Sequence, residues 1–511
     1  MITAARLRRA FRRETIGVDV GAALNLVGAL LRYFSATFLA PAAVALGYGE
    51  PPWPFLAAGA ITAGLGIGLE RLTPGKERVG AREGYFVIAL VWLLVAAAGA
   101  LPYMLAGEEQ LRSPVDAYFE SMSGFTTTGA SVLTDIEGLS RSLAFWRQLT
   151  TWVGGMGILV LALAVLPRLR VGGRQLFESE APGPEVERLT VTIREAARRF
   201  LLLYVAITAL GAAVLTVIGL AGFDDAMNLY EAVGHSFAAV ATAGFSTQAR
   251  SFEEFSAATQ WTVVVFMIVA GTNFALTYAA IVRRRPRVFL RDEEFRLYVP
   301  LLALGSALVL AELLRADLLA GEAAVRHAVF NAVSTMTTTG FVSADFNEWT
   351  ALTSVTLVGL MFVGASAGST SGSVKVVRHV LVGKILRREL DQTVHPELVA
   401  PIHLNRSLID ERTLGAVIVF VLLYIGFFAL GALGILIDSA RLDVVIRPID
   451  AIAASATTLG NVGPALGIAG PMGSFDPFGT TSKLIMIALM WLGRLEILPV
   501  VVLLTRSYWR A

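Results

Sequence analysis

The chain has 511 residues, of which 55% are hydrophobic and only 16% are charged, with a mean hydropathy of +0.66. Soluble domains carry about 25% charged residues, so this composition excludes a soluble globular protein and indicates an integral membrane protein. The lack of cysteine excludes disulfides and thiolate metal sites. The formal net charge of +2 is small, and we expect no nucleic-acid partner.

The first segment, residues 1–83, is predicted to hold a cytoplasmic N-terminal end and a two-helix hairpin. The arginines at its start precede a long apolar run without a convincing cleavage site, which favours a retained end over a signal peptide. The two apolar runs, 20–48 and 53–69, contain no glycine loop of the kind that recurs later in the chain. The hairpin is therefore expected to lie outside the repeat described next.

Four similar units follow the hairpin, with predicted boundaries at 84–198, 199–296, 297–411 and 412–511. Each is predicted to contain a spanning helix, a short helix, a glycine-centred loop and a second spanning helix. The predicted first spanning helices are 84–106, 199–220, 297–320 and 413–437. The predicted short helices are 113–125, 226–241, 326–337 and 447–457. The predicted second spanning helices are 145–166, 260–282, 351–381 and 483–505.

The short helices cannot cross a membrane. About 13 helical residues extend roughly 20 Å, whereas the hydrocarbon core is about 30 Å thick. We expect half-helices that enter and return through the loop. With two spanning helices in each unit, all four units enter in the same orientation. The fold class is thus an all-α polytopic membrane protein with four tandem repeats, pseudo-fourfold symmetry and an N-terminal two-helix hairpin.

The glycine loops are the candidate binding site. One such loop alone is an ordinary turn, but four copies in four similar apolar contexts favour a function. Lipid cannot satisfy irregular backbone, so these loops must line water or be buried in protein. Glycine allows its carbonyl to turn inward, and rings of carbonyls select cations. Aligned on the glycine, the predicted filter residues are Thr127, Thr128, Gly129, Thr242, Ala243, Gly244, Thr338, Thr339, Gly340, Thr458, Leu459 and Gly460.

Basic residues predict the orientation. Most of the 42 Lys and Arg residues lie on one side of the predicted spans, and the positive-inside rule makes that side cytoplasmic. It includes both termini and the loops 70–83, 167–199, 283–296 and 375–412. We therefore predict a multi-pass protein of the plasma (inner) membrane with cytoplasmic termini. The half-helices then enter from outside, and their C-terminal ends favour a cation.

The second spanning helix of the third unit is interrupted by residues 364–373, which are Gly, Ala, Ser and Thr only. Small residues can form a tight helix–helix contact, but a loop beneath the filter would act as a gate. Arg494 is expected about halfway down the final helix at similar depth, and a buried arginine is costly. The predicted gate residues are Gly364, Ser366, Gly368, Ser369, Thr370, Ser371, Gly372, Lys375 and Arg494.

The same stretch contains G-x-S-x-G at residues 364–368. A nucleophile elbow requires a preceding strand, a following helix and a histidine base, whereas here the flanks are membrane helix. We expect no enzyme activity. His235 and His327 are expected to be hydrogen-bonding residues of half-helices. Glu120 and Glu231 either satisfy half-helix neighbours or attract cations.

These motifs resemble those of the Trk/Ktr/HKT superfamily of potassium transporters, and most of all the Trk-type membrane subunit. The resemblance covers nearly the whole chain, and the leading hairpin is typical of the Trk branch. Its specific motifs are residues 123–130, 241–247, 337–341, 368–372, 460–464 and 493–496. One departure is Ser373, where relatives usually have another glycine before the lysine.

The resemblance implies K⁺ as the transported ion, four filter glycines, and a gating loop with an arginine beside it. It implies no organic cofactor in this chain. It also implies a homodimer of two pores, in contact with membrane lipid and docked on a cytoplasmic ring of nucleotide-binding regulatory subunits.

Two transport mechanisms remain open: channel-like uptake and symport with H⁺ or Na⁺. A membrane potential contributes about 2.3 kcal/mol per charge per 100 mV, and a tenfold gradient costs about 1.4 kcal/mol. About 150 mV therefore sustains a few-hundred-fold accumulation without coupling. Few intramembrane carboxylates are available for a proton relay, which favours the channel-like mechanism.

Overall fold

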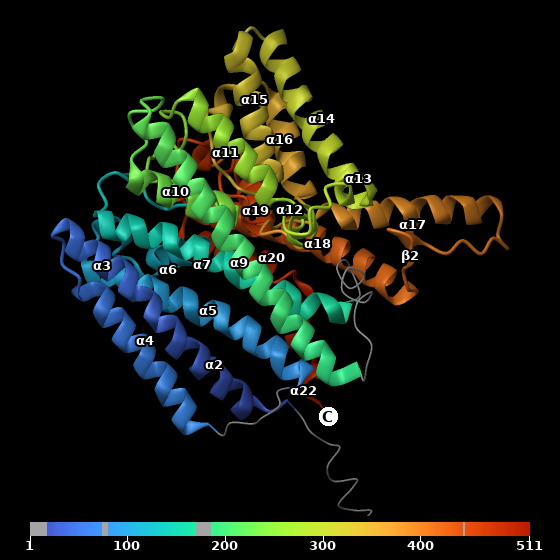
Figure 1. Cartoon of the computed structure of the whole chain (residues 1–511), viewed down its shortest axis with the longest axis horizontal. Coiled ribbons are helices and arrows are strands. Elements are labelled where there is room, and N and C mark those ends of the chain that lie inside the picture. The colour runs from blue at the N-terminus through green and yellow to red at the C-terminus, as the bar shows by residue number, and fades with distance from the viewer. Residues whose placement is uncertain (1–17, 74–79, 170–184, 443–444, 511) are drawn as a thin grey trace, which may run out of the picture. The chain divides into compact units, whose positions relative to one another are not determined.

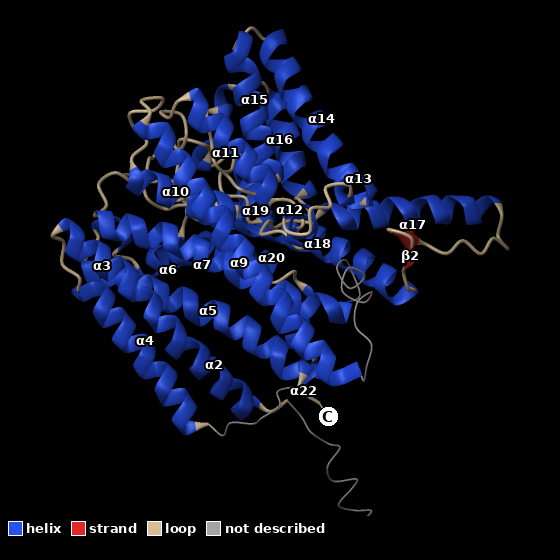
Figure 2. Ribbon diagram, in the orientation of Figure 1, coloured by secondary structure: helices blue, strands red, loops and turns tan. Residues whose placement is uncertain are grey.

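A computed structural model of the chain describes residues 18–73, 80–169, 185–442 and 445–510, with side chains omitted at 81, 160–169 and 185–194. The predicted N-terminal end and parts of the basic loops 70–83 and 167–199 lie outside these residues. Figure 2 shows that the described chain is mostly helical, with loops between the helices. Its only strands are β1 (His403–Leu404) and β2 (Ser407–Leu408), which pair antiparallel. This agrees with the predicted all-α class.

The chain divides into two compact units, of which the first is Met1–Ser121, Ser140–Leu143 and Leu495–Ala511. In it, Gly28 and Gly66 let two helices of the predicted hairpin touch: a Cβ on either glycine would lie 2.6 Å from the carbonyl oxygen of the other. Small residues allow such close helix contacts within lipid. The elements are α2 (Val20–Phe34), η1 (Ser35–Phe38), α3 (Leu39–Tyr48), α4 (Trp53–Leu72), α5 (Ala81–Ala106), η2 (Glu109–Leu111), α21 (Leu498–Leu503) and α22 (Arg506–Trp509).

The second unit is Met122–Leu139 and Ala144–Arg494. Two helices, α6 (Pro114–Phe125) and α7 (Arg141–Leu169), continue into it from the first. Its remaining elements are α9 (Glu185–Leu220), α10 (Leu229–Ala241), α11 (Ala257–Ala270), α12 (Phe274–Ile281), α13 (Val288–Arg291), α14 (Glu293–Arg315), α15 (Gly321–Met336), η3 (Phe346–Glu348), α16 (Ala351–Val363), α17 (Val376–Val394), α18 (Glu411–Arg441), α19 (Pro448–Gly460), η4 (Gly467–Ala469) and α20 (Thr480–Arg494).

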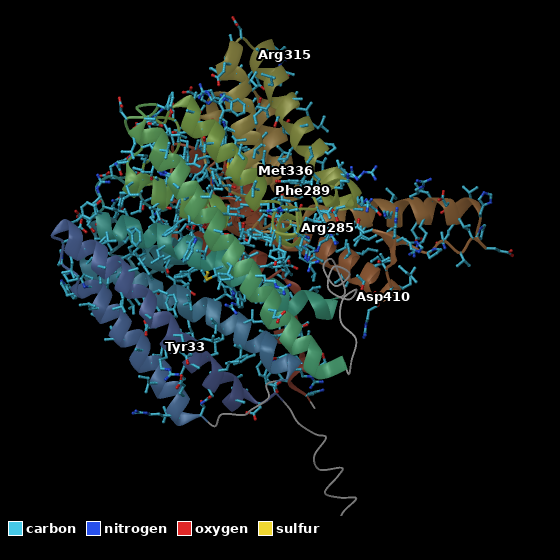
Figure 3. All side chains as sticks on the ribbon, viewed as in Figure 1. Tyr33, Arg285, Phe289, Arg315, Met336 and Asp410 are labelled. Carbon is cyan, nitrogen blue, oxygen red and sulfur yellow. The ribbon has the colours of Figure 1, made fainter. Side chains whose placement is uncertain are left out.

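The third repeat illustrates the repeated arrangement. Helices α14, α15 and α16 lie side by side (Figure 1). Arg315 lies at one tip of this group, while Met336 lies well inside it and is fully buried (Figure 3). The longest half-helix, α15, has 16 residues, or about 24 Å, which is too short to cross a core of about 30 Å. The other half-helices, α6, α10 and α19, are shorter still.

Within the described residues, six helices are long and apolar enough to cross a membrane, or seven if one bent pair is counted as a single span. They comprise the hairpin and the first helices of the four repeats, which supports a multi-pass membrane protein. The six spans are Val20–Tyr48, Trp53–Leu72, Arg82–Ala106, Glu195–Leu220, Glu293–Arg315 and Glu411–Arg441. The boundaries of the five predicted segments, 1–83, 84–198, 199–296, 297–411 and 412–511, remain a prediction.

Besides the interrupted helix of the third repeat, two predicted second spanning helices are not continuous. The span predicted at 260–282 bends by 106° between α11 and α12, where the side chain of Asn273 caps α12 by accepting from the Ala275 N–H at 2.8 Å. The span predicted at 483–505 ends its first helix at Arg494, and Glu496 and Ile497 both have a φ of 58°. Left-handed backbone at non-glycine residues interrupts a helix, which apolar patterning alone does not reveal.

Candidate ion pathway

Each half-helix ends in the same turn. In each turn, the first or second residue after the helix adopts a left-handed φ of 51° to 56°. The N–H of the residue that follows donates to the carbonyl five residues earlier at 2.8 to 2.9 Å. This closure turns the following backbone away from the helix axis. The left-handed residues are Thr127, Thr242, Thr338 and Asn461. The donating residues are Thr128, Ala243, Thr339 and Val462.

This geometry corrects the predicted register of the fourth loop by three residues. Gly460 is the last residue of α19, so Thr458, Leu459 and Gly460 form the final helical turn and not the loop. In the other loops a glycine stands two residues after the left-handed residue, and in the fourth that glycine is Gly463, with a φ of 116°. The threonine common to all copies gave the wrong alignment because Asn461 takes its structural place.

Four glycines, Gly129, Gly244, Gly340 and Gly463, form a closed ring and are called the ring glycines below. A Cβ on Gly129 would lie 2.5 Å from Gly244 N, and one on Gly244 would lie 2.7 Å from Gly340 O. A Cβ on Gly340 would lie 1.9 Å from Val462 O, and one on Gly463 would lie 2.7 Å from Thr128 O. Each ring glycine thus touches the next loop where a side chain has no room.

The ring glycines line one cavity of about 260 Å³. A water molecule takes about 30 Å³ in the liquid, so the space suits several waters or a hydrated ion. Its lining also includes the side chains of Ser131, Thr134, Ser246 and Gln248. Among the described residues that line it, the one charged side chain is Arg147, whose Nη1 donates to Ser246 O at 2.7 Å.

Hydroxyl groups tie the loops together and to their own helices. Thr126 Oγ1 donates to Met122 O at 2.7 Å, and Thr337 Oγ1 donates to Val333 O at 2.8 Å. Asn461 Nδ2 donates to Thr128 Oγ1 at 3.0 Å, which links the fourth loop to the first. The ring therefore consists of four similar turns, each anchored on the helix that precedes it.

The predicted interruption in the third repeat is present as a loop between α16 and α17. Residues 364–375, called the intramembrane loop, are buried except at Gly368, which is partly exposed. Left-handed φ values occur at Gly364, Gly368, Ser373 and Lys375. These values exclude the alternative of a continuous helix with a tight small-residue contact. Ser373, the noted departure, donates its hydroxyl to Met361 O at 2.5 Å.

The intramembrane loop lies against the half-helices at the base of the ring. Gly372 N donates to Thr338 Oγ1 at 2.8 Å, and a Cβ on Gly372 would lie 2.4 Å from Gly460 O. Thr370 Oγ1 donates to Val240 O at 3.1 Å. The loop thus contacts residues of the second, third and fourth repeats. Its serines also bond among themselves, with Ser369 Oγ 2.7 Å from Ser371 Oγ.

Arg494 meets this loop, although it stands at the end of α20 and not halfway along a continuous helix. Its Nη1 donates to Thr370 O at 2.8 Å, and its Nη2 donates to Gly154 O at 3.3 Å. The side chain is almost fully buried, with 2% of the residue exposed. The guanidinium therefore places a positive charge and hydrogen-bond donors against the loop.

Sequence reasoning missed Glu294, the second group that holds the loop. Its Oε1 accepts from Ala367 N at 2.6 Å and from Val377 N at 3.1 Å, so one oxygen atom ties a residue of the loop to the first turn of α17. The residue is 5% exposed. No local pattern indicated this role, because an acidic residue in the first turn of a helix is ordinary.

The ring and the buried loop invite comparison with known transporters. A family model described as TrkH, Cation transport protein, matches residues 55–510. The chain belongs to the TrkH family. This confirms the resemblance inferred from the motifs. The all-α repeat fold is confirmed by similarity to the crystal structure of the potassium transporter TrkH from Vibrio parahaemolyticus. That comparison has a TM-score of 0.86 and 33% identity, and covers 96% of this chain and 100% of that one.

Sequence relatives extend over the same length. The Trk system potassium uptake protein TrkH of Escherichia coli K12 is 36% identical over 95% of this chain and 98% of its own. The Trk system potassium uptake protein TrkG of the same strain is 30% identical over 95% and 98%. TrkI of Halomonas elongata is 33% identical over 83% and 84%. These are names of transport proteins, and the prediction that the chain is not an enzyme is confirmed.

Proposed function

We propose that this protein takes up K⁺ across the plasma (inner) membrane through a channel-like path selected at the ring. The observation that carries the proposal is the closed ring of four glycine backbones lining one cavity. The potassium uptake named for the relatives supports the choice of ion. K⁺ is thus the transported ion, with no organic cofactor in the chain.

Selection follows from backbone chemistry. Carbonyl dipoles of the ring loops replace part of the hydration shell of a cation, while the C-terminal ends of four half-helices favour positive charge at the same place. Because each loop is closed by a hydrogen bond to its own half-helix, the carbonyl oxygens keep their positions while ions pass. The filter set is therefore Thr127–Gly129, Thr242–Gly244, Thr338–Gly340 and Asn461–Gly463.

Gating follows from the intramembrane loop. The loop occupies the base of the ring in a conformation held by Arg494 and Glu294. A gate needs two states separated by a few kcal/mol, and releasing either side chain from the loop frees its backbone for a second path. We assign this conformation to the closed state, in which the charge of Arg494 against the loop opposes K⁺.

Regulation comes from the cytoplasmic side. Arg284, Arg285 and Arg287 are exposed near α13, where Figure 3 labels Arg285 and Phe289. The proposal assigns this basic segment to docking a cytoplasmic ring of nucleotide-binding subunits, with anionic lipid as the competing ligand. The assembly is a homodimer in which each protomer has its own pore and both termini are cytoplasmic.

Symport with H⁺ is the second candidate, and Glu294 is the observation that favours it, since a buried intramembrane carboxylate is a candidate proton carrier. Flux of K⁺ and Na⁺ in liposomes, with and without a pH gradient, separates the two mechanisms. We expect K⁺ entry driven by voltage alone. An absolute requirement for an inward proton gradient would overturn channel-like uptake in favour of symport, and equal K⁺ and Na⁺ flux would overturn the filter.

A further inference from the structure

Polar side chains of the second half-helix hold the backbone that follows Gly244. His235 Nε2 lies 2.9 Å from Ser246 Oγ, and its Nδ1 lies 2.9 Å from Glu231 O. Thr247 Oγ1 donates to the Glu231 carboxylate. His235 is fully buried, and Glu231 is 2% exposed. The stretch that leaves the ring is thus fixed to α10 at two successive residues.

The direction of these hydrogen bonds can be assigned. A backbone carbonyl only accepts, so Nδ1 of His235 donates to Glu231 O, and the Nε2 of a neutral imidazole then accepts from Ser246 Oγ. Ser246 Oγ in turn accepts from Gln248 N at 3.1 Å. A neutral His235 with its proton on Nδ1 satisfies every group in the chain. The imidazole therefore connects the backbone carbonyl of Glu231 to the hydroxyl of Ser246.

The third repeat has the same device with different side chains. Counted from the ring glycines, His327 stands where Glu231 does, Asn331 where His235 does, and Ser343 where Thr247 does. Asn331 Nδ2 donates to Ser343 Oγ at 3.0 Å, and His327 Nδ1 lies 2.9 Å from the same oxygen. In the first and fourth loops the equivalent position carries apolar Val132 and Leu466.

The side chains that hold the exits of the second and third loops are called the braces below. The backbone segments that they hold are also joined to each other. Phe252 N donates to Val342 O at 2.8 Å, and Val342 N donates to Ser251 Oγ at 3.1 Å. The ring of His235 packs edge-on against Phe252, with centroids 4.8 Å apart, and also meets Phe341 at 6.2 Å. The braces of the second and third loops are therefore connected to each other through Ser251, Phe252 and Val342.

We propose that Glu231 with His235, and His327 with Asn331, are positioning residues that set the discrimination between K⁺ and Na⁺. They fix the exits of the second and third ring loops without touching the ion. The inference rests on the proposed role of the ring as a filter. A binding constellation must be held to within about 0.5 Å to keep its geometry, and the braces act within three residues of Gly244 and Gly340. The role left open for Glu231 is thereby assigned.

The test measures the K⁺ to Na⁺ permeability ratio of reconstituted His235→Leu and Asn331→Leu variants. Each change removes one of the two side-chain contacts to a loop exit. We expect the ratio to fall by about fivefold, the effect of one buried hydrogen bond. Rescue by His235→Gln is expected, because its amide oxygen can accept from Ser246 Oγ. His403→Leu, at the exposed residue of β1, is the matched control and should leave the ratio unchanged.

The exchange variant E231H/H235N/T247S places the third-repeat set in the second repeat, and we expect it to restore the ratio lost in His235→Leu. If His235→Leu does not fold, Thr247→Val provides the test, because it removes only the hydroxyl that donates to Glu231. The K⁺ to Na⁺ permeability ratio of Thr247→Val should fall. A merely structural role would lower the melting temperature and total flux with an unchanged ratio, which would overturn the inference. If Gly129→Ser alters the ratio while the brace variants do not, the ring keeps its proposed role as the filter, and the inference about the positioning residues is wrong. If none of these alters the ratio, both fail.

Discussion

The ring loops and the intramembrane loop are two buried stretches of irregular backbone that are satisfied in different ways. Each ring loop closes on its own half-helix through a bond to the carbonyl five residues earlier. The intramembrane loop instead depends on distant groups: Glu294, Arg494 and the carbonyl of Gly271. Backbone satisfied by its own helix is fixed, whereas backbone satisfied by other elements can be released when those elements move. In the proposed function, this difference separates a rigid selector, formed by the ring loops, from a switch, formed by the intramembrane loop.

The largest effect is expected from a Cβ inside the rigid part. Gly340→Ala should abolish K⁺ flux in liposomes, because the added carbon would lie 1.9 Å from Val462 O and the residue has a φ of 80°. Gly359→Ala is the matched control, since its Cβ would meet nothing within 4 Å. Wild-type flux in Gly340→Ala would contradict the closed ring.

The next largest effect is expected from freeing the loop. Arg494→Ala removes a charged hydrogen bond to Thr370 O. Such a bond is worth about 1.5–3 kcal/mol. Because about 1.4 kcal/mol corresponds to a tenfold change in an equilibrium constant, the open state should become more populated by at least that factor. K⁺ flux should therefore rise by about tenfold or more with an unchanged K⁺ to Na⁺ ratio. Shortening the loop by two residues should act in the same direction.

Loss of selectivity at constant flux in either of these variants would make the loop a support of the filter and not a gate. Tracer uptake of K⁺ and Na⁺ in the same liposomes measures both quantities.

Glu294→Gln should give a smaller rise of about fivefold. The amide keeps one acceptor oxygen for Ala367 N and Val377 N, but its other terminal atom is an N–H₂ group that only donates. One weakened buried hydrogen bond costs about 1 kcal/mol. Glu312→Gln changes a carboxylate near the other end of α14, bonded to Arg315, and serves as the control. Flux unchanged by Glu294→Gln would remove this residue from the switch.

The smallest effect concerns the regulatory partner. Reversing the charges of Arg283–Arg285 should weaken binding of a nucleotide-binding ring subunit in a pull-down, and the difference should shrink as salt is raised. Because these residues lie far along the chain from the ring glycines, the permeability ratio should not change. If charge reversal does not change the binding of the ring subunit, the basic segment contacts anionic lipid and not this partner.

The sequence predicted the repeats, the half-helices and the contact of Arg494 with the loop, because apolar runs and small-residue stretches are local signals. It did not predict the bend before Asn273, which depends on Phe274 N donating to Gly368 O in another repeat. It also misplaced the fourth loop, because an alignment on threonine cannot show that Asn461 adopts the left-handed turn. Glu294 was missed because its partners lie far away in the chain.

The central claim is that Gly463, and not Gly460, completes the ring. The most direct measurement compares the K⁺ to Na⁺ permeability ratio of Gly463→Ala and Gly460→Ala in liposomes under a fixed voltage. A Cβ at Gly463 would lie 2.7 Å from Thr128 O, whereas one at Gly460 would come no closer than 3.2 Å to any neighbour, the nearest being the side-chain Cγ2 of Val462. We predict a fall of about tenfold for Gly463→Ala and none for Gly460→Ala. The reverse order would contradict the ring.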